Sequence, residues 1–362
     1  MAPIRVGIIG LSATSSWAVK AHLPYLQESP RYEITGVCNS SLATSEAAIK
    51  AHGLSCKAYG SIAELAASDD VDLVVCSVRV DRHYECLKPA LEAGKNCFVE
   101  WPLASNLQQA TELLELAEEK GVKTVIGLQG VMSPAIRRVK ELVEQGAIGE
   151  VLSSHLDLAT GLGTAETLDS IAYLNDVELG GNMLTIPFGH LYDSVSYVLG
   201  ELREVSATLS TQIPQVKVKA ADGSVTKTMQ RTTADHAAIS GLLHSGAQSS
   251  AVVHGRGPIK SSPALSWQIE GNKGVIDVRG DSAFAVSMSG GIEMKLYDLA
   301  TGEESPIEYT EDRPGPPGNI GRVYDAFADG EWYPDWEWAV QRHSWVDAVY
   351  KSNESGKRVA YA

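Results

Sequence analysis

Short apolar runs alternate with longer amphipathic segments along residues 1–129, and this alternation constrains the fold more than any other feature. Runs rich in Val and Ile indicate buried strands at residues 4–11, 32–39, 71–78, 95–101 and 123–129. The segments between them have helical spacing, which is typical of parallel strands joined by crossover helices. The sequence therefore predicts an α/β fold that begins with a Rossmann domain, a doubly wound parallel sheet, over residues 1–129.

Residues 130–362 show a different pattern, in which alternating apolar and polar residues are interrupted by short turns. Such stretches at 203–213, 236–244 and 266–280 predict a large, mostly antiparallel sheet. We therefore expect an α+β domain that binds the substrate and carries the oligomer contacts. A terminal helix is expected near residues 337–355, packed back toward the first domain.

Composition and charge exclude several classes of protein. A chain of 362 residues is long enough for two cores, and no apolar run approaches the roughly 20 residues of a membrane-spanning helix. The N-terminus lacks the features of a signal peptide and the five cysteines form no CxxC pair, so we expect a cytoplasmic protein with reduced thiols. The net charge of -15, without clusters of Lys and Arg, argues against nucleic-acid binding. No residues have the spacing of a metal site, so no metal is predicted.

The turn after the first strand has the context of a dinucleotide-binding loop. It contains Gly7 and Gly10, followed by small and hydroxyl residues where the G-x-G-x-x-G pattern continues with glycine. Small side chains still allow backbone N–H groups to approach a pyrophosphate, and hydroxyls can donate to phosphate. The candidate cofactor contacts in this segment are Gly10, Ser12, Ala13, Ser15, Ser16 and Trp17. A strand-turn-helix connection without a ligand is the alternative.

The end of the second strand affects the choice of nucleotide. NAD-binding sheets usually place an acidic residue there, on the ribose 2′-hydroxyl. This chain has Asn39, Ser40 and Ser41 instead, and no arginine follows at once to bind a 2′-phosphate. The absence of a negative charge favours NADP over NAD, with Asn39 and Ser40 as candidate contacts.

Two segments carry a resemblance to a known family. Residues 77–105 contain His83 in the turn after the third strand and the frame Glu100-x-Pro102 at the end of the fourth. Residues 180–195 contain Gly180, Gly181, His190 and Asp193 in the spacing of a second motif. In these motifs the chain resembles the glucose-fructose oxidoreductase, inositol dehydrogenase and MocA (Gfo/Idh/MocA) family over nearly its whole length. The resemblance implies a nicotinamide dinucleotide, with Val78, Arg79, His83, Glu100, Trp101 and Gln129 as further cofactor contacts.

Two departures from the family pattern affect the expected chemistry. Trp101 stands where the family has the lysine of E-K-P, and Ile186 stands where it has an aspartate four residues before the histidine. An indole donates a hydrogen bond but does not exchange a proton near neutral pH, and isoleucine does neither. Acid-base assistance contributes roughly 10²–10⁴-fold in rate, so ordinary sugar or inositol oxidation should be impaired. The catalytic candidates are His190 as the remaining acid or base, Trp101 and Asp193.

The chain also resembles the subgroup of this family that contains the galactose-pathway repressors of yeasts, at residues 10–22, 99–101, 128–134, 140–149 and 188–193. The resemblance implies a fungal protein. Insertions that the repressors carry in their second domain, implicated in partner binding, are missing between residues 200 and 330, which weakens the hypothesis of a repressor.

Three functions are left open. The leading hypothesis is an NAD(P)-dependent oxidoreductase that acts on a small, rather apolar or aromatic hydroxy or keto metabolite, in a pocket between the sheet's carboxyl edge and the second domain. The second is a non-catalytic, dinucleotide-dependent regulator or sensor. The third is a lyase, isomerase or cyclase without net redox chemistry.

Further expectations concern the second domain. Asp235 and His236 could form a dyad that reaches a substrate, although hydrogen bonding at a sheet edge is the favoured interpretation. Tryptophans at positions 332, 336, 338 and 345 are expected to pack the terminal helix against the first domain. A large sheet with one face free of helices should expose apolar surface, so we expect a homodimer that forms sheet to sheet.

Overall fold

The chain divides into two compact units in the computed structural model, which describes residues 2–288 and 290–361. Unit 1 contains Met1–Gln129 and Arg313–Val340, and unit 2 contains Gly130–Asp312 and Gln341–Ala362. Residues 313–340, which the sequence pattern places in the second domain, lie with the Rossmann strands in the structure. A helical pattern shows that a helix forms but not which sheet it contacts, so the pattern alone did not reveal this return of the chain.

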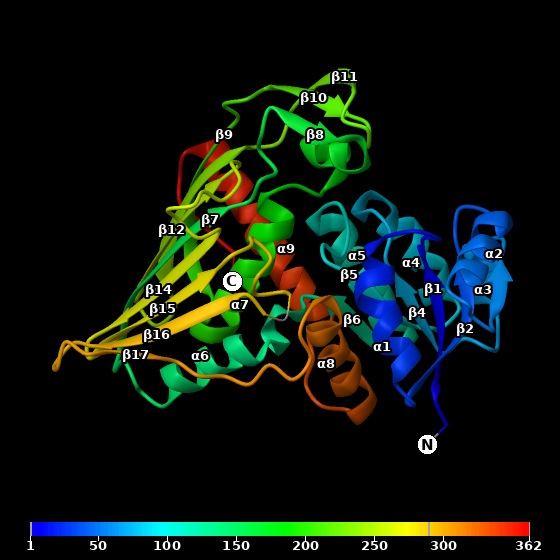
Figure 1. Cartoon of the computed structure of the whole chain (residues 1–362), viewed down its shortest axis with the longest axis horizontal. Coiled ribbons are helices and arrows are strands. Elements are labelled where there is room, and N and C mark those ends of the chain that lie inside the picture. The colour runs from blue at the N-terminus through cyan, green and yellow to red at the C-terminus, as the bar shows by residue number, and fades with distance from the viewer. Residues whose placement is uncertain (1, 289, 362) are drawn as a thin grey trace. The chain divides into compact units, whose positions relative to one another are not determined.

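Unit 1 is built on a six-stranded sheet with the order β3-β2-β1-β4-β5-β6 (Figure 1). Its parallel strands are β1 Ile4–Ile9, β2 Tyr32–Cys38, β3 Lys57–Tyr59, β4 Leu73–Cys76, β5 Asn96–Glu100 and β6 Thr124–Gly127. The strand order reverses at β1, so the predicted doubly wound sheet is confirmed. The expectation of five strands missed β3, which spans three residues at the sheet edge. A strand this short has no alternation that a sequence pattern can show.

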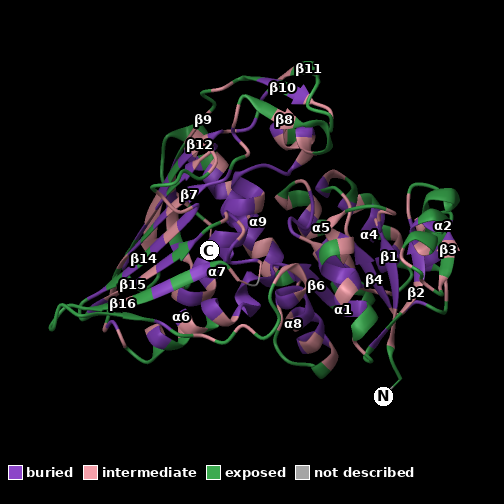
Figure 2. Cartoon of the chain, viewed as in Figure 1, coloured by how far each residue is buried: buried purple, intermediate pink, exposed green. Residues whose placement is uncertain are grey.

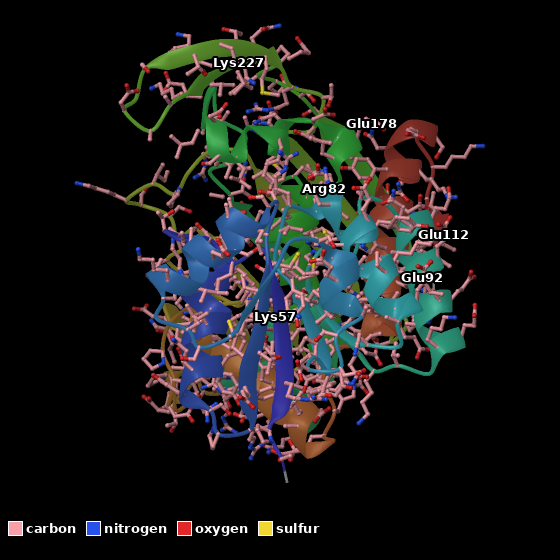
Figure 3. The ribbon with its side chains drawn as sticks, turned by 90° about the vertical axis from the view of Figure 1, so that its right-hand side faces the viewer. Lys57, Arg82, Glu92, Glu112, Glu178 and Lys227 are labelled. Carbon is pink, nitrogen blue, oxygen red and sulfur yellow. The ribbon has the colours of Figure 1, made fainter. Side chains whose placement is uncertain are left out.

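The helices of unit 1 pack against this sheet and against one another. They are α1 Leu23–Glu28, α2 Leu42–Ala51, α3 Ile62–Ala66, α4 His83–Glu92, α5 Leu107–Lys120, α8 Pro316–Asp329 and the start of α9 Trp336–Ser355. α1 contacts α8, whereas α4 contacts both α3 and α5. The strands β4 and β6 are buried along their whole length (Figure 2). The outer sides of α4 and α5 carry exposed carboxylates, among them Glu92 and Glu112 (Figure 3).

Aromatic side chains pack residues 313–340 into unit 1. The Trp336 indole Nε1 donates to the Val125 carbonyl of β6 at 3.0 Å. Tyr324 of α8 is completely buried and stacks on Tyr25 of α1, with ring centroids 5.3 Å apart. These contacts hold α8 and the first turn of α9 on the Rossmann strands.

Unit 2 contains a nine-stranded sheet with the order β17-β16-β15-β14-β7-β13-β12-β9-β18. Its strands are β7 Val151–Ala159, β9 Leu202–Ser210, β12 His236–Leu243, β13 Gln248–His254, β14 Leu265–Gly271, β15 Gly274–Gly280, β16 Ile292–Asp298, β17 Glu304–Pro306 and β18 Val359–Ala360. β7 and β13 run parallel, and the other neighbouring pairs are antiparallel. The predicted large, mostly antiparallel sheet is therefore confirmed.

Smaller elements complete unit 2. A three-stranded sheet has the order β11-β10-β8, with β8 Glu166–Leu168, β10 Gln215–Lys219 and β11 Val225–Gln230. α6 Pro134–Glu144, α7 Gly189–Leu199 and the part of α9 after Val340 lie on one face of the nine-stranded sheet (Figure 1). Short 3-10 turns occur in this unit at Asp169–Asn175 and Val177–Leu179; two others are Val80–Arg82 in unit 1 and Gln129–Met132, where the chain passes from unit 1 to unit 2.

The other face of the nine-stranded sheet carries no helix within the described residues (Figure 1). Strand register places side chains in rows across it. One row is Ser250, His155, Gln268, Asp277 and Lys295, and the next is Val252, Asp157, Ser266, Arg279 and Glu293. Among these ten side chains only Val252 is apolar, and the exposed Ala238 of β12 continues its row. The expectation of an exposed apolar face is therefore wrong, and the predicted homodimer loses that argument.

Candidate functional site

The turn after β1 approaches the end of β4 so closely that only glycine fits at position 10. Gly10 has a φ of 95°, and a β-carbon built on it would lie 2.5 Å from the Ser77 carbonyl oxygen. In the loop that follows, Ser12 Oγ accepts from the Thr14 amide at 3.1 Å. His52 of α2 lies with its Nε2 2.7 Å from the Ser12 carbonyl oxygen, to which it donates. These contacts fix a short loop at the carboxyl end of β1.

A π-helical turn, Ala18–His22, connects this loop to α1. Ser16 Oγ accepts from the Val19 amide at 3.3 Å at its start. Trp17, the N-cap residue, buries its indole N–H without a hydrogen-bond partner in the described part of the chain. A buried donor without a partner costs about 1–3 kcal/mol, so it marks a position where a ligand can supply the missing acceptor. π-helical turns are themselves frequent at functional sites.

At the end of β2, the side chain of Asn39 binds the neighbouring backbone. Its Nδ2 donates to the Leu11 carbonyl at 2.8 Å and to the Thr44 carbonyl at 3.1 Å. Ser40 is exposed, and Ser41 caps α2 by accepting from the Thr44 amide at 3.3 Å. Asn39 thus connects the glycine loop to α2, and this strand end presents hydroxyls and an amide rather than a carboxylate.

The end of β4 is tied to the end of β5 by His83. This side chain is 1% exposed; its Nδ1 lies 2.8 Å from the Pro102 carbonyl oxygen and its Nε2 3.1 Å from that of Val78. Burial lowers the pKa of His83, so the ring is neutral at pH 7 and donates to one carbonyl at a time. Arg79 pairs with Asp81 through two hydrogen bonds of 3.0 Å. His83 therefore fixes the loops, while Arg79 lies at the surface.

β5 and β6 end in the remaining candidates of unit 1. Glu100 is the last residue of β5, and Trp101, which follows it, is 5% exposed. The Trp101–Pro102 peptide bond is cis. Gln129, after β6, is 1% exposed, and its side-chain oxygen has no hydrogen-bond partner within the described residues. An acceptor is thus left open beside this strand end, as a donor is at Trp17.

The structure brings the cofactor candidates of unit 1 to one edge of the parallel sheet. Gly10, Ser12, Ala13, Ser15, Ser16 and Trp17 follow β1, Asn39 and Ser40 follow β2, Val78, Arg79 and His83 follow β4, Glu100 and Trp101 end β5, and Gln129 follows β6. Ligands of open α/β sheets bind at this carboxyl edge, where the strand order reverses. The indole N–H of Trp17 and the side-chain oxygen of Gln129, which lack partners within the described residues, are available as a donor and an acceptor for a polar ligand. These residues fit a nicotinamide dinucleotide.

In unit 2, His190 lies in the first turn of α7, directly after a second π-helical turn, Leu184–Phe188. Its side chain is 6% exposed, its ring centroid lies 6.3 Å from that of Phe284, and its Nδ1 has no hydrogen-bond partner in the described part of the chain. Burial lowers the pKa of His190 to about 4, so the imidazole is neutral at pH 7. Ile186, half-buried, lies in the π-helical turn.

Asp193 belongs to a buried group of charges. Its side chain is 0% exposed and its Oδ1 lies 4.0 Å from Arg342 Nε of α9. The Arg342 guanidinium also donates to Glu201, which accepts a second hydrogen bond from the Tyr361 hydroxyl at 2.9 Å. The complete burial of Asp193 and its proximity to Arg342 favour a structural role, in which the carboxylate balances the charge of the guanidinium.

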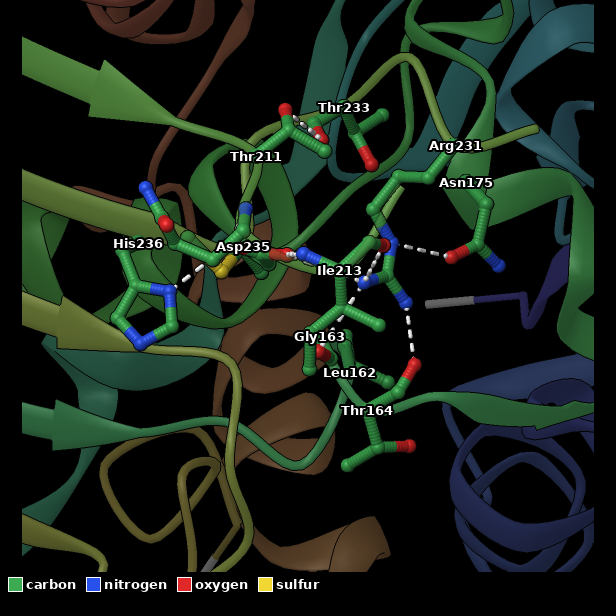
Figure 4. Close-up of polar contacts among 12 residues, drawn as sticks. Leu162, Gly163, Thr164, Asn175, Thr211, Ile213, Arg231, Thr233, Asp235 and His236 are labelled. Atoms are coloured by element: carbon green, nitrogen blue, oxygen red, sulfur yellow. Dashed lines mark hydrogen bonds and ion pairs between the residues drawn. The ribbon is translucent and has the colours of Figure 1, made fainter. Parts of the chain in front are cut away.

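The Asp235–His236 pair is part of a hydrogen-bonded support for the neighbouring loops (Figure 4). The buried Asp235 carboxylate accepts from the Gln212 amide at 2.8 Å, the Ile213 amide at 2.7 Å and His236 Nδ1 at 2.8 Å. Arg231, 2% exposed, adds a hydrogen bond to Asp235 at 3.3 Å and binds the carbonyls of residues 163, 164 and 213. These contacts agree with the favoured interpretation of hydrogen bonding rather than catalysis.

The described residues provide neither a metal-ligand cluster nor a membrane-spanning helix. No group of three or more His, Cys, Asp or Glu side chains could hold a metal ion. No helix among residues 2–288 and 290–361 is both long and apolar enough to cross a membrane.

Two family models match the chain. Residues 4–128 match the oxidoreductase family with an NAD-binding Rossmann fold, Gfo/Idh/MocA, and residues 134–280 match the C-terminal domain of Gal80p. The first match covers the parallel sheet and the second begins at α6, so both follow the elements described above.

Relatives resemble the chain over almost its whole length. The galactose/lactose metabolism regulatory protein GAL80 of Saccharomyces cerevisiae is 31% identical, over 98% of this chain and 94% of that protein. The dehydrogenase aclE of Aspergillus oryzae is 33% identical, over 99% of this chain and 98% of that protein. The crystal structure of a super-repressor mutant of Gal80p from S. cerevisiae superimposes with a TM-score of 0.91 at 30% identity, covering 99% of this chain and 98% of that one. The chain therefore belongs to the Gfo/Idh/MocA oxidoreductase family, and it combines the family's NAD-binding Rossmann domain with a C-terminal domain of the Gal80p type.

Proposed function

We propose that the chain is an NAD(P)-dependent oxidoreductase that acts on a small hydroxy or keto metabolite of rather apolar or aromatic character. The observation that carries this proposal is its nearly gap-free likeness to the dehydrogenase aclE, which aligns over 367 residues with the 362 of this chain. The alignment with the yeast regulator GAL80 runs over 407 residues, so that relative has inserted residues that this chain lacks.

Unit 1 provides the cofactor site in this proposal. A bound nicotinamide dinucleotide supplies the hydride chemistry. Gly10 lets the turn after β1 pack closely against the end of β4 in the sequence context of a pyrophosphate-binding loop, and Trp17 and Gln129 offer the unused donor and acceptor described above. Asn39 and Ser40 place no negative charge at the end of β2, so we propose NADP in preference to NAD.

His190 is the side chain that we propose moves the proton. Nδ1 of its neutral imidazole has no hydrogen-bond partner within the described residues. Depending on the tautomer, Nδ1 offers a ligand either a lone pair or an N–H. Trp101 and Ile186 stand where the family motif has proton-carrying residues, and neither side chain exchanges a proton near neutral pH. Their apolar character also favours an aromatic or apolar substrate over a polyol.

A dinucleotide-dependent regulator is the second candidate, and one observation favours it. A base whose pKa lies near 4 is a weak proton acceptor at pH 7, and His190 has such a pKa. The close structural match to Gal80p agrees with this hypothesis. In a regulator, the same strand-end site would bind the dinucleotide without turnover.

Binding and turnover separate the two candidates. Calorimetric titration should show binding of NADP at least as tight as binding of NAD; tight NAD binding without NADP binding contradicts the proposed preference. A panel of ketones and aromatic alcohols, followed at the nicotinamide absorbance band, should yield a substrate. Replacement of His190 by Ala should then abolish turnover and preserve dinucleotide binding. Unchanged turnover excludes His190 as the acid-base, and binding without any turnover across the panel favours the regulator.

Self-association is a separate proposal. We keep the homodimer as a hypothesis because polar sheet faces also form interfaces. Light scattering that gives the mass of one chain, 38.7 kDa, excludes it.

A further inference from the structure

Three side chains form a continuous hydrogen-bonded line beneath the end of β5. His22, the last residue of the π-helical turn, is 0% exposed. Its Nε2 lies 2.6 Å from Glu100 Oε1, and its Nδ1 lies 2.8 Å from the Tyr324 hydroxyl. The line connects the glycine-loop segment, the strand end before Trp101 and helix α8, all within unit 1. Glu100 is a cofactor candidate, but the cofactor site and the proton transfer described above use neither His22 nor Tyr324.

Aromatic rings enclose His22 and exclude water from it. Phe98 meets the imidazole edge to face with centroids 5.1 Å apart, and Tyr324 does so at 5.8 Å. The titratable groups that face His22 are Glu100 from β5 and Tyr324 from α8. Behind Tyr324 lie Tyr25 of α1, which stacks on its ring, and Tyr32 of β2, whose hydroxyl donates to the Tyr324 carbonyl at 2.6 Å.

The partners of the Tyr324 hydroxyl determine where the hydrogens lie. Burial raises the pKa of Tyr324 well above its ordinary value, so the phenol keeps its hydrogen. His22 Nδ1 is the acceptor for that hydrogen, because the Tyr324 hydroxyl has no other partner in the described part of the chain. Nε2 of His22 then carries the ring hydrogen and donates it to Glu100. An imidazolium, which donates from both nitrogens, would leave the buried phenol hydrogen without an acceptor.

Glu100 brings one end of the line to the carboxyl edge of the sheet. Oε1 accepts from His22, whereas Oε2 has no hydrogen-bond partner within the described residues, and the side chain is 13% exposed. Gly127 of β6 lies against the carboxylate, and a β-carbon there would be 2.8 Å from Oε2. The carboxylate is therefore held on two sides, by a hydrogen-bond donor and by a close strand, and keeps one oxygen for a ligand.

We propose that His22 and Tyr324 are positioning residues that fix the Glu100 carboxylate, so that Oε2 accepts a hydrogen bond from an N–H or O–H donor of the bound dinucleotide. The nicotinamide carboxamide, the ribose hydroxyls and the adenine amino group are donors of that kind in NAD and NADP. This inference rests on the proposed binding of a dinucleotide by unit 1. It specifies which oxygen of Glu100 faces the dinucleotide and assigns a function to two buried residues that do not touch the ligand.

A double-mutant cycle tests the coupling through Glu100. NADP and NAD are titrated into the full chain, with tryptophan fluorescence or calorimetry as the readout, for wild type, Tyr324→Phe, Glu100→Ala and the double variant. Tyr324→Phe should weaken binding roughly threefold to tenfold, the size of one hydrogen bond's net contribution. In the Glu100→Ala background the same change should have no further effect, because its target is gone.

Tyr25→Phe is the matched control. It removes one phenol oxygen from the same aromatic cluster, where the Tyr25 hydroxyl donates to Asp325 Oδ1 at 2.6 Å and makes no contact with His22. Dinucleotide affinity should stay at the wild-type value. An equal loss in Tyr25→Phe and Tyr324→Phe would show that the cluster only supports the fold, and it would overturn the proposal.

NMR of the His22 ring gives a readout that packing alone does not move. In wild type the ring nitrogens should show Nδ1 as a hydrogen-bond acceptor and Nε2 as the nitrogen that carries the hydrogen. In Tyr324→Phe, Nδ1 loses its hydrogen-bond donor, so the chemical shift of Nδ1 should move toward that of an acceptor without a hydrogen bond. The inference is overturned if the His22 ring signals of Tyr324→Phe match those of wild type. It is also overturned if Tyr324→Phe weakens binding equally in the wild-type and Glu100→Ala backgrounds. Dinucleotide binding by unit 1 stands in both cases. A folded wild type that binds neither nucleotide overturns the proposed function and this inference together.

Discussion

His190 should make the stability of the protein depend on pH. Burial lowers the pKa of its imidazole to about 4 in the folded chain, against 6.5 in an unfolded chain. Between these values the unfolded chain binds a proton that the folded chain does not. Stability therefore falls as the pH drops below the unfolded value, and this loss ends near the folded value, where both states carry the proton.

The magnitude follows from the difference between the two pKa values. One pKa unit corresponds to about 1.4 kcal/mol, so full protonation of the unfolded chain costs the folded state about 3 kcal/mol. About 2 kcal/mol of this is lost between pH 7 and pH 5. That loss is a substantial fraction of the free energy of unfolding of a typical protein, which is roughly 5–15 kcal/mol.

Urea unfolding of wild type and His190→Gln at pH 7, 6 and 5 measures the effect. Glutamine has no titration in this range, so the free energy of unfolding of the variant should fall by about 2 kcal/mol less than that of wild type. His83, whose pKa is also lowered by burial, is present in both proteins, so its contribution cancels in the comparison. If the two proteins lose stability equally, His190 is hydrated or partnered in solution, and the reasoning from its burial is refuted.

Three substitutions test the elements that support the site. Gly10→Ala should destabilise unit 1 by at least about 2 kcal/mol and abolish dinucleotide binding, because its β-carbon would meet the Ser77 carbonyl at a positive φ; denaturation and calorimetry measure both effects. Arg231→Met should cost about 3–5 kcal/mol of unfolding free energy, since it leaves buried carbonyls and a carboxylate without their donor, and a loss below 1 kcal/mol contradicts that role. Trp336→Phe, which removes the donor to the Val125 carbonyl, should lower the melting temperature and cost about 2 kcal/mol.

The sequence predicted the Rossmann sheet well because parallel strands buried on both faces are continuous apolar runs. β4, Leu73–Cys76, is such a run, and its shortness and β-branched residues favour a strand over a buried helix. The uncovered sheet face was misjudged for the opposite reason. Its strands alternate, and a pattern of alternation shows that two faces differ without showing that the outer face, with His155 and Gln268, is polar enough to meet water.

The candidate site was predictable only as far as strand order determines it. Residues that follow β1, β2, β4, β5 and β6 share one edge in any doubly wound sheet, so their grouping required no knowledge of side-chain contacts. The partners of Asn39 and His83 depend on loop conformation and are found only in the structure. His22 and Tyr324 lie 302 positions apart, and no local pattern connects them.

The two candidate functions make different demands on His190, and this difference decides between them. A regulator needs the dinucleotide edge of unit 1 and nothing from the imidazole, so a pKa near 4 can persist when ligands bind. An enzyme needs the pKa to rise toward the working pH, because Trp101 and Ile186 provide no other proton carrier. A substrate oxygen that gains negative charge beside Nδ1 would produce that rise, since an opposite charge nearby favours the imidazolium. Titration of His190 by NMR, with the dinucleotide and a bound hydroxy or keto compound present, therefore measures the property in which the two hypotheses differ.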